Sequence, residues 1–78
     1  MKTIKISLDS IDRVKSFAGT IHRFDAEFDL VSGRYTVDAK SIMGIFSLDL
    51  SKPIDLNIHA EGKELENICK VLNPYTIS

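Results

Sequence analysis

The chain is short of the residues that build disulfides, metal sites and membrane segments. Its 78 residues include one cysteine, two histidines, two prolines and no tryptophan. The single cysteine, Cys69, excludes a disulfide within the chain and offers no set of metal ligands. The longest apolar runs are only a few residues, far below the length that crosses a bilayer. Because residues 1–6 alternate polar and apolar side chains, we expect no signal peptide.

An excess of charge of one sign is also lacking, since Lys plus Arg number 10 and Asp plus Glu number 11. Nucleic-acid binding needs a concentrated basic face, and this near-neutral composition argues against it. Hydrophobic residues at 44% and charged residues at 27% are an ordinary globular balance. We therefore expect one folded domain over residues 1–78 in the reducing cytoplasm. We expect no metal, no cofactor, no nucleic-acid partner and no insertion into a membrane.

The spacing of apolar residues predicts seven structural elements. Alternation is typical of a half-buried strand, and recurrence at three and four residues is typical of one helix face. The predicted strands are 4–8, 26–30, 35–39 and 54–60, and the predicted helices are 11–21, 42–48 and 63–72. Asp9 or Ser10 is expected to cap the first helix and Ser41 the second, because a short side-chain oxygen can accept a free backbone N–H.

The order β-α-β-β-α-β-α, with one apolar face on each strand, predicts an α+β fold. A two-layer, open-faced sandwich would place a four-stranded antiparallel sheet against helices on one face. A ferredoxin-like split βαβ arrangement has nearly the same order of elements. It would suit a small-ligand-binding domain with a pocket between helices and sheet, and the sequence leaves this alternative open.

Residues 39–48 read Ala-Lys-Ser-Ile-Met-Gly-Ile-Phe-Ser-Leu. This run resembles the regulatory-serine region of HPr, the histidine-containing phosphocarrier protein of the bacterial sugar phosphotransferase system. The likeness is strong over residues 24–62 and looser at both ends. It includes Ala-Glu-Gly at 60–62, which leads into the last helix in HPr as well. The resemblance implies the HPr-like sandwich and protein partners from the phosphotransferase system or HPr-kinase-like proteins.

One segment departs from the HPr pattern. In HPr the loop before the first helix carries a motif similar to Leu-His-Ala-Arg-Pro, whose histidine accepts the phosphoryl group from Enzyme I. Here residues 7–14 contain no histidine, and Asp9 and Asp12 would repel an incoming phosphate. Arg13 beside them is interpreted as a solvated helix residue. The chain is therefore identified as a divergent HPr-family member without the phosphorylated histidine, a non-catalytic or regulatory interaction module rather than an enzyme, with no catalytic residue.

A phosphocarrier role through another residue remains an alternative and would require His22 or His59. His22 is predicted at the C-terminal end of the first helix, where the helix dipole disfavours a phosphate. His59 is predicted on the solvent side of the fourth strand. Both are expected to be surface histidines with no catalytic role.

Ser41 is the candidate regulatory phosphosite. It is predicted to be the N-cap of the second helix, whatever other role it has. By the resemblance it aligns with the serine that HPr kinase/phosphorylase modifies in catabolite control. A phosphate at this place could create a new docking charge.

The short helix after Ser41 has more apolar residues than one face can bury. Ile45 and Leu48 are expected to point inward. An exposed apolar patch usually marks a contact surface, and in HPr the same positions contact partner proteins. The predicted partner contact surface is Ile42, Met43 and Phe46; no oligomeric state is predicted.

Overall fold

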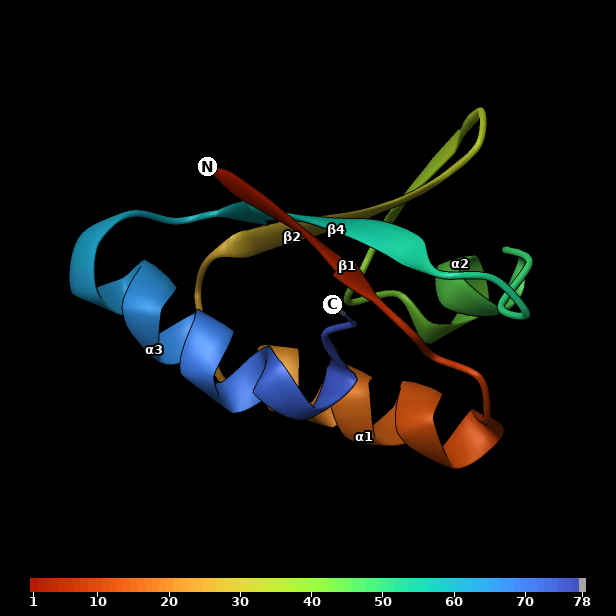
Figure 1. The fold of residues 1–78 in the computed structure, drawn as a ribbon, viewed down its shortest axis with the longest axis horizontal. Coiled ribbons are helices and arrows are strands. Elements are labelled where there is room, and N and C mark those ends of the chain that lie inside the picture. The colour runs from red at the N-terminus through yellow and green to blue at the C-terminus, as the bar shows by residue number, and fades with distance from the viewer. Residues whose placement is uncertain (78) are drawn as a thin grey trace.

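The computed structural model describes residues 1–77 and contains four strands and three α-helices in the predicted order (Figure 1). The strands are β1 (Lys2–Ile6), β2 (Glu27–Ser32), β3 (Tyr35–Asp38) and β4 (Ile54–His59). The helices are α1 (Ile11–Ile21), α2 (Ile42–Phe46) and α3 (Gly62–Leu72), and a 3-10 turn follows at Asn73–Tyr75. The spacing of apolar residues therefore located every α-helix and strand, and the differences lie at element ends.

The sheet has the strand order β1-β4-β2-β3, and all three pairings are antiparallel. β1 and β2 both pair antiparallel with β4, so they run parallel to each other, joined by α1 and separated by β4. In a ferredoxin-like sheet the third strand of the chain lies between the first two, whereas here β3 lies at the edge and β4 takes that place. The ferredoxin-like alternative is therefore wrong, and the predicted α+β sandwich is confirmed. Figure 1 shows α1 and α3 together below the sheet, while α2 lies at one end of it.

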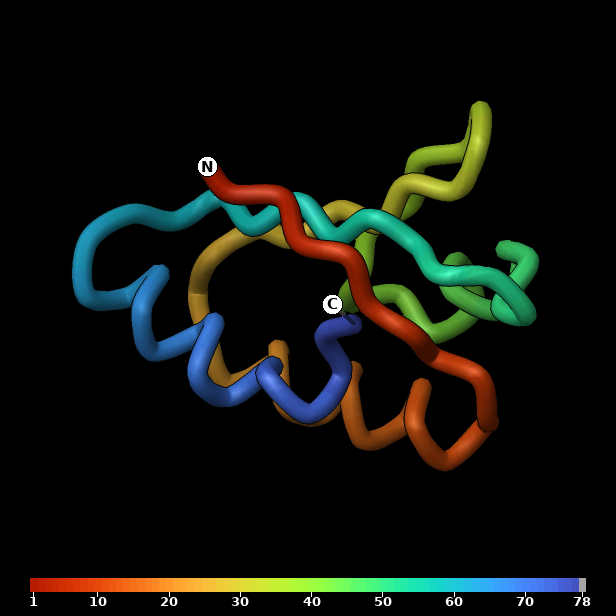
Figure 2. The backbone as a smooth tube through the Cα atoms, in the orientation of Figure 1, coloured from red at the N-terminus to blue at the C-terminus, as the bar shows by residue number. Residues whose placement is uncertain are grey.

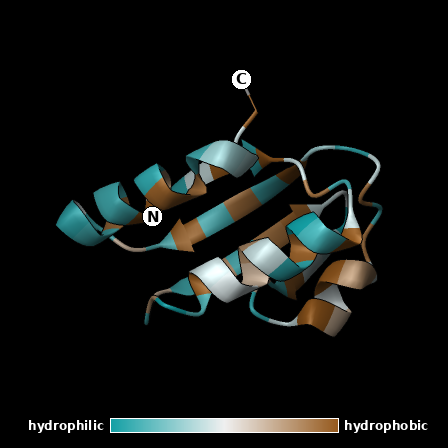
Figure 3. Cartoon of the chain, turned by 90° about the horizontal axis from the view of Figure 1, so that it is seen from below, coloured by the Kyte–Doolittle hydropathy of each residue, from teal (hydrophilic) through white to brown (hydrophobic). Residues whose placement is uncertain are grey.

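The core lies between the sheet and the helices. Along β4 the buried residues Ile54, Leu56 and Ile58 alternate with Asp55 and Asn57, which face solvent on the open side of the sheet. Burying one such aliphatic side chain contributes about 1.5 to 3 kcal/mol. The other fully buried large side chains are Phe17, Phe28, Ile6, Leu8, Ile21, Leu30, Ile45, Ile68 and Leu72. Seen from the helical side, the outer surfaces of α1 and α3 are largely hydrophilic or neutral, whereas α2 is hydrophobic over most of its length (Figure 3).

Three positions differ from the predicted pattern. The first strand ends at Ile6, and Leu8 is buried in the loop that follows it. The second helix ends at Phe46 rather than near Leu48, because the Ser47 Oγ donates to the Gly44 carbonyl at 2.5 Å and closes the last turn. Tyr35 continues the apolar alternation of β3 yet is 72% exposed, because the β2–β3 hairpin projects away from the helices (Figure 1).

The C-terminal segment returns to lie beside β1 (Figure 2). The Ser7 amide donates to the Tyr75 carbonyl at 3.0 Å, and the Ile77 amide donates to the Lys5 carbonyl at 3.0 Å. Ile6 and Thr76 form an antiparallel bridge between these two hydrogen bonds. The sequence predicted only that the last helix stops at Asn73-Pro74. The pairing covers part of the outer edge of β1 and brings Tyr75 against α1.

Candidate functional site

The loop from Ser7 to Ser10 joins β1 to α1, where the HPr resemblance predicts a phosphocarrier histidine. Ser10 is the N-cap of α1, with extended backbone, and its Oγ accepts a hydrogen bond from the Arg13 amide at 3.1 Å. The prediction that Asp9 or Ser10 caps this helix is thus resolved in favour of Ser10. The loop sequence Ser-Leu-Asp-Ser contains no imidazole.

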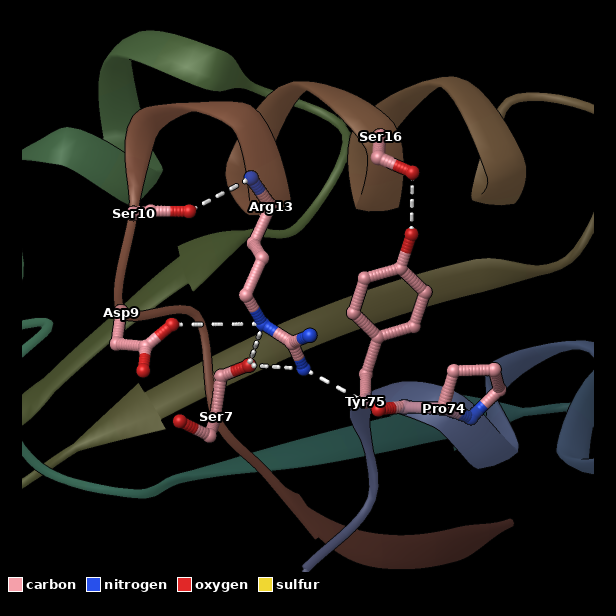
Figure 4. Close-up of polar contacts among 7 residues, drawn as sticks. All are labelled: Ser7, Asp9, Ser10, Arg13, Ser16, Pro74 and Tyr75. Atoms are coloured by element: carbon pink, nitrogen blue, oxygen red, sulfur yellow. Dashed lines mark hydrogen bonds and ion pairs between the residues drawn. The ribbon is translucent and has the colours of Figure 1, made fainter.

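Arg13 holds this loop to the C-terminal segment (Figure 4). Its Nε and Nη2 donate to the Ser7 carbonyl at 3.2 and 3.1 Å, and Nη2 also donates to the Pro74 carbonyl at 3.2 Å. The Nε lies 3.5 Å from the Asp9 carboxylate. The interpretation of Arg13 as a solvated helix residue is therefore wrong. Its partners are backbone carbonyls brought together only by the fold, and the spacing of residues could not reveal them.

Tyr75 completes this arrangement from the C-terminal side. Its ring lies 5.0 Å from the Arg13 guanidinium and packs edge-on against Phe17 with the ring centroids 5.7 Å apart. Its hydroxyl is hydrogen-bonded to the Ser16 Oγ at 2.5 Å (Figure 4). No local pattern in the sequence marks Tyr75, because its partners are almost sixty residues away along the chain. We call Ser7, Asp9, Arg13, Pro74 and Tyr75 the α1 clamp.

Both histidines lie away from the start of α1. His22 is the C-cap of that helix, and its Nε2 lies 3.2 Å from the Lys40 carbonyl. The eleven residues of α1 separate it from the N-terminus of that helix by about 16 Å. His59 ends β4 on the open face of the sheet, where its Nε2 lies 2.6 Å from the Asp29 carboxylate. The structure therefore brings neither imidazole to the free amides at the N-terminus of α1.

Ser41 is exposed and caps α2, with its Oγ accepting a hydrogen bond from the Gly44 amide at 3.2 Å. Gly44 permits a close approach of α2 to β3, because a Cβ placed there would lie 3.3 Å from both the Ser41 Oγ and the Val37 Cβ. The Lys40 ammonium donates to the Phe24 carbonyl at 2.7 Å. The Ser-Ile-Met-Gly run thus combines a cap with the one small residue that the packing requires.

The side chains of α2 divide as the sequence predicted. Ile45 is fully buried, and Leu48 beyond the helix is nearly so. The predicted contact residues Ile42, Met43 and Phe46 are 42%, 85% and 43% exposed.

A groove of about 370 Å³ joins this surface to the start of α1. Leu8, Asp9, Ser10 and Ile11 line it on one side, and Phe46, Leu50 and Ser51 on the other. The sequence does not predict this groove, because its two lining segments are about forty residues apart in the chain.

The comparison with protein families matches the family described as "PTS HPr component phosphorylation site" over residues 13–75. The chain belongs to the HPr family. The match begins at Arg13 and does not include the loop of residues 7–10.

Two solved structures of HPr proteins resemble the chain throughout. HPr-C-His from Thermoanaerobacter tengcongensis is 28% identical, with a TM-score of 0.76, over 95% of this chain and 89% of that one. The phosphocarrier protein HPr from Bacillus anthracis str. Ames is 29% identical, with a TM-score of 0.69, over 97% of this chain and 94% of that one. The predicted family and fold are therefore confirmed, and with them the relation to the phosphocarriers of the phosphotransferase system.

Within residues 1–77, no three His, Cys, Asp or Glu side chains are grouped so that they could hold a metal ion. None of the helices in this same range is both long enough and apolar enough to cross a membrane.

Proposed function

We propose that this HPr-family protein is a regulatory protein-interaction module of the phosphotransferase system and that it carries no phosphohistidine. The observation that supports the proposal is the α1 clamp. In a carrier, a phosphoryl group on an imidazole benefits from free amides at a helix N-terminus and from a nearby arginine. Here Ser10 occupies the cap, and the Arg13 guanidinium already donates to the carbonyls of Ser7 and Pro74. Asp9 and Asp12 add negative charge at the same place.

The test is incubation of the purified chain with Enzyme I and phosphoenolpyruvate, with an HPr from a relative as the positive control. We expect the relative to acquire acid-labile phosphate and this chain to remain unmodified. Acid-labile phosphate on this chain would contradict the proposal. The variants His22→Ala and His59→Ala would then identify which imidazole carries it.

The proposed partner surface is Ile42, Met43 and Phe46. Its support is the exposure of these three side chains on one short helix. Contact of apolar area with water is unfavourable, and a partner would remove that area from solvent. Phe46→Asp should abolish capture of partners from an extract of the cell of origin. Val71→Asp is the matched control, because Val71 is 41% exposed on α3 and lies outside this surface. Equal capture by the two variants would refute the surface.

We further propose that Ser41 is the regulatory phosphosite. Support comes from its exposure and from its position as the first residue of the Ser-Ile-Met-Gly run. Incubation with an HPr-kinase-like enzyme and ATP should label the wild type and Ser47→Ala, whereas Ser41→Ala should remain unlabelled. Ser47 is a matched control, because it is also exposed and lies at the opposite end of α2. Labelling of Ser41→Ala at the wild-type level would contradict the assignment.

A further inference from the structure

The sheet has two outer edges, and the fold covers part of only one of them. The edge of β1 is paired in part by the C-terminal segment, through the hydrogen bonds of Ser7 with Tyr75 and of Ile77 with Lys5. No segment of residues 1–77 pairs with the outer edge of β3, which ends the strand order. Such an edge offers unpaired backbone donors and acceptors to another chain. The β2–β3 hairpin also projects from the body of the protein, where a second molecule can reach it (Figure 1).

The ladder between β2 and β3 determines which backbone groups of β3 face outward. The Ala39 amide donates to the Phe28 carbonyl at 3.0 Å. In an antiparallel pair, residues bonded to the neighbouring strand alternate with residues that are not. Counting back from Ala39, Thr36 and Asp38 are the residues whose backbone groups point away from β2. The Asp38 carbonyl already accepts the Ser41 amide at 3.0 Å. An added strand can therefore pair with both backbone groups of Thr36 and with the N–H of Asp38.

The Asp38 carboxylate has no cation paired with it among residues 1–77. In the register of β2 and β3 it stands directly opposite Asp29, and like charges in such a pair are destabilising. The two nearest cations have other acceptors, since the His59 Nε2 lies 2.6 Å from the Asp29 carboxylate and the Lys40 ammonium donates to the Phe24 carbonyl at 2.7 Å. Four carboxylates and one lysine are among the residues that line the hollow of about 250 Å³ beside it: Asp25, Glu27, Asp29, Asp38 and Lys40.

Arg34 at the tip of the hairpin can supply this cation from a second copy of the chain. It is exposed and makes no ion pair with any residue that the structure describes. Residues 34–38 read Arg-Tyr-Thr-Val-Asp, with opposite charges at the two ends and Thr36 at the centre. When two copies pair antiparallel about Thr36, Arg34 of each lies opposite Asp38 of the other. Tyr35, which is 72% exposed, then lies opposite Val37 of the other copy.

We propose that the outer edge of β3 is a dimer interface, in which the β3 strands of two copies pair antiparallel about Thr36. Charge selects this register. Centring the pair on Asp38 would oppose two carboxylates, and centring it on Val37 would oppose Arg34 to Lys40. The contact is short, so we expect a weak dimer with a dissociation constant on the order of 0.1 to 1 mM. The inference does not rest on the proposed function, whose partner surface lies on α2.

Sedimentation equilibrium and amide NMR of the full chain, at concentrations up to about 1 mM, test whether the dimer forms. The apparent mass should rise toward that of a dimer with concentration. The amides of Thr36 and Asp38 should shift and gain protection from hydrogen exchange, whereas the Val37 amide, which already bonds to β2, should gain none. Added salt should weaken the dimer, because exposed charges are screened. A chain that stays monomeric throughout this range overturns the inference.

A charge swap tests the pairing of Arg34 with Asp38. Arg34→Glu and Asp38→Arg should each weaken dimerisation by about tenfold or more, because each substitution opposes like charges at two places in the dimer. An equimolar mixture of the two variants restores opposite charges at both places and should dimerise within a few-fold of the wild type. The chain that carries both substitutions should do the same. Asp38→Arg removes the like charge opposite Asp29, so the fold should persist.

Arg23→Glu is the matched control, because it makes the same change in net charge at an exposed site outside the hairpin, and it should leave the dimer intact. Thr36→Pro tests the backbone pairing separately from the charges. Proline removes the outward N–H and is tolerated on an edge strand where that group faces solvent, so circular dichroism should report a retained fold without a dimer.

The inference is overturned if Arg34→Glu or Thr36→Pro dimerises as the wild type does, or if the mixture of charge variants stays monomeric. It is also overturned if the wild type is monomeric while Thr36→Pro loses a partner that the wild type captures from an extract. That result would assign the edge of β3 to a strand of another protein instead of a second copy.

Discussion

Replacing Arg13 by alanine tests the α1 clamp, on which the argument against a phosphohistidine depends. The substitution removes the hydrogen bonds to the Ser7 and Pro74 carbonyls, the ion pair with Asp9 and the contact with the Tyr75 ring. Bonding to each of the two carbonyls contributes about 1 kcal/mol, a reduced figure for a charged donor because the side chain is 37% exposed. The exposed ion pair and the cation–π contact contribute about 0.5 kcal/mol each. Water can replace part of this in the variant, so we expect a loss of about 2 kcal/mol in the free energy of unfolding.

For a domain of this size, that loss lowers Tm by roughly 8 to 16 °C, measured by circular dichroism. The Ser7 amide, which donates to Tyr75, should also exchange its hydrogen faster as the C-terminal segment loosens. Arg13→Lys should give an intermediate loss, because it keeps the charge but not the planar fork of donors.

Arg23→Ala is the matched control for this experiment. Arg23 follows α1, is exposed, and makes no side-chain hydrogen bond or ion pair among residues 1–77. Its loss should change stability by less than about 0.5 kcal/mol. If Arg13→Ala changes the free energy of unfolding by as little as Arg23→Ala does, the clamp does not hold the guanidinium, and Arg13 is available to an anion.

Two further predictions concern glycines and one carboxylate. Gly44→Ala should lower the free energy of unfolding, measured by urea titration, by about 1 kcal/mol, because the new Cβ presses on the Cβ of Val37. Gly19→Ala has open space around it in α1 and should raise the same free energy by about 0.5 to 1 kcal/mol. Two changes of the same sign would contradict this account of α2 packing. The pKa of Asp49, followed by NMR, should lie below its ordinary value and should rise in Ser51→Ala, since hydrogen bonds from Ser51 favour the charged form. Because the folded pKa is the lower one, this carboxylate stabilises the fold above its ordinary pKa, and the contribution disappears as the pH falls through the folded value. An unchanged pKa in Ser51→Ala would remove the stated cause.

The candidate site was predictable only where its members are neighbours in sequence. Ser41, Ile42, Met43 and Phe46 stand within six residues, so a cap followed by surplus apolar side chains was visible as a pattern. The clamp was not visible, because the acceptors of Arg13 are carbonyls, which every residue possesses, and one of them lies sixty-one residues away. Tyr35 shows the opposite case. The alternation correctly predicted its strand, but its side chain is exposed, because burial depends on whether a helix covers that end of the hairpin.

By itself the sequence determined the elements, the inward face of each and the absence of a histidine before α1, because hydrophobic period and residue identity are local properties. Only the tertiary structure decided the strand order, the return of the C-terminal segment to β1 and the use of Arg13. Each of these depends on which distant backbone groups meet when the apolar faces are buried together. Nearly every residue carries the same backbone N–H and C=O, so the sequence does not show which of them will pair.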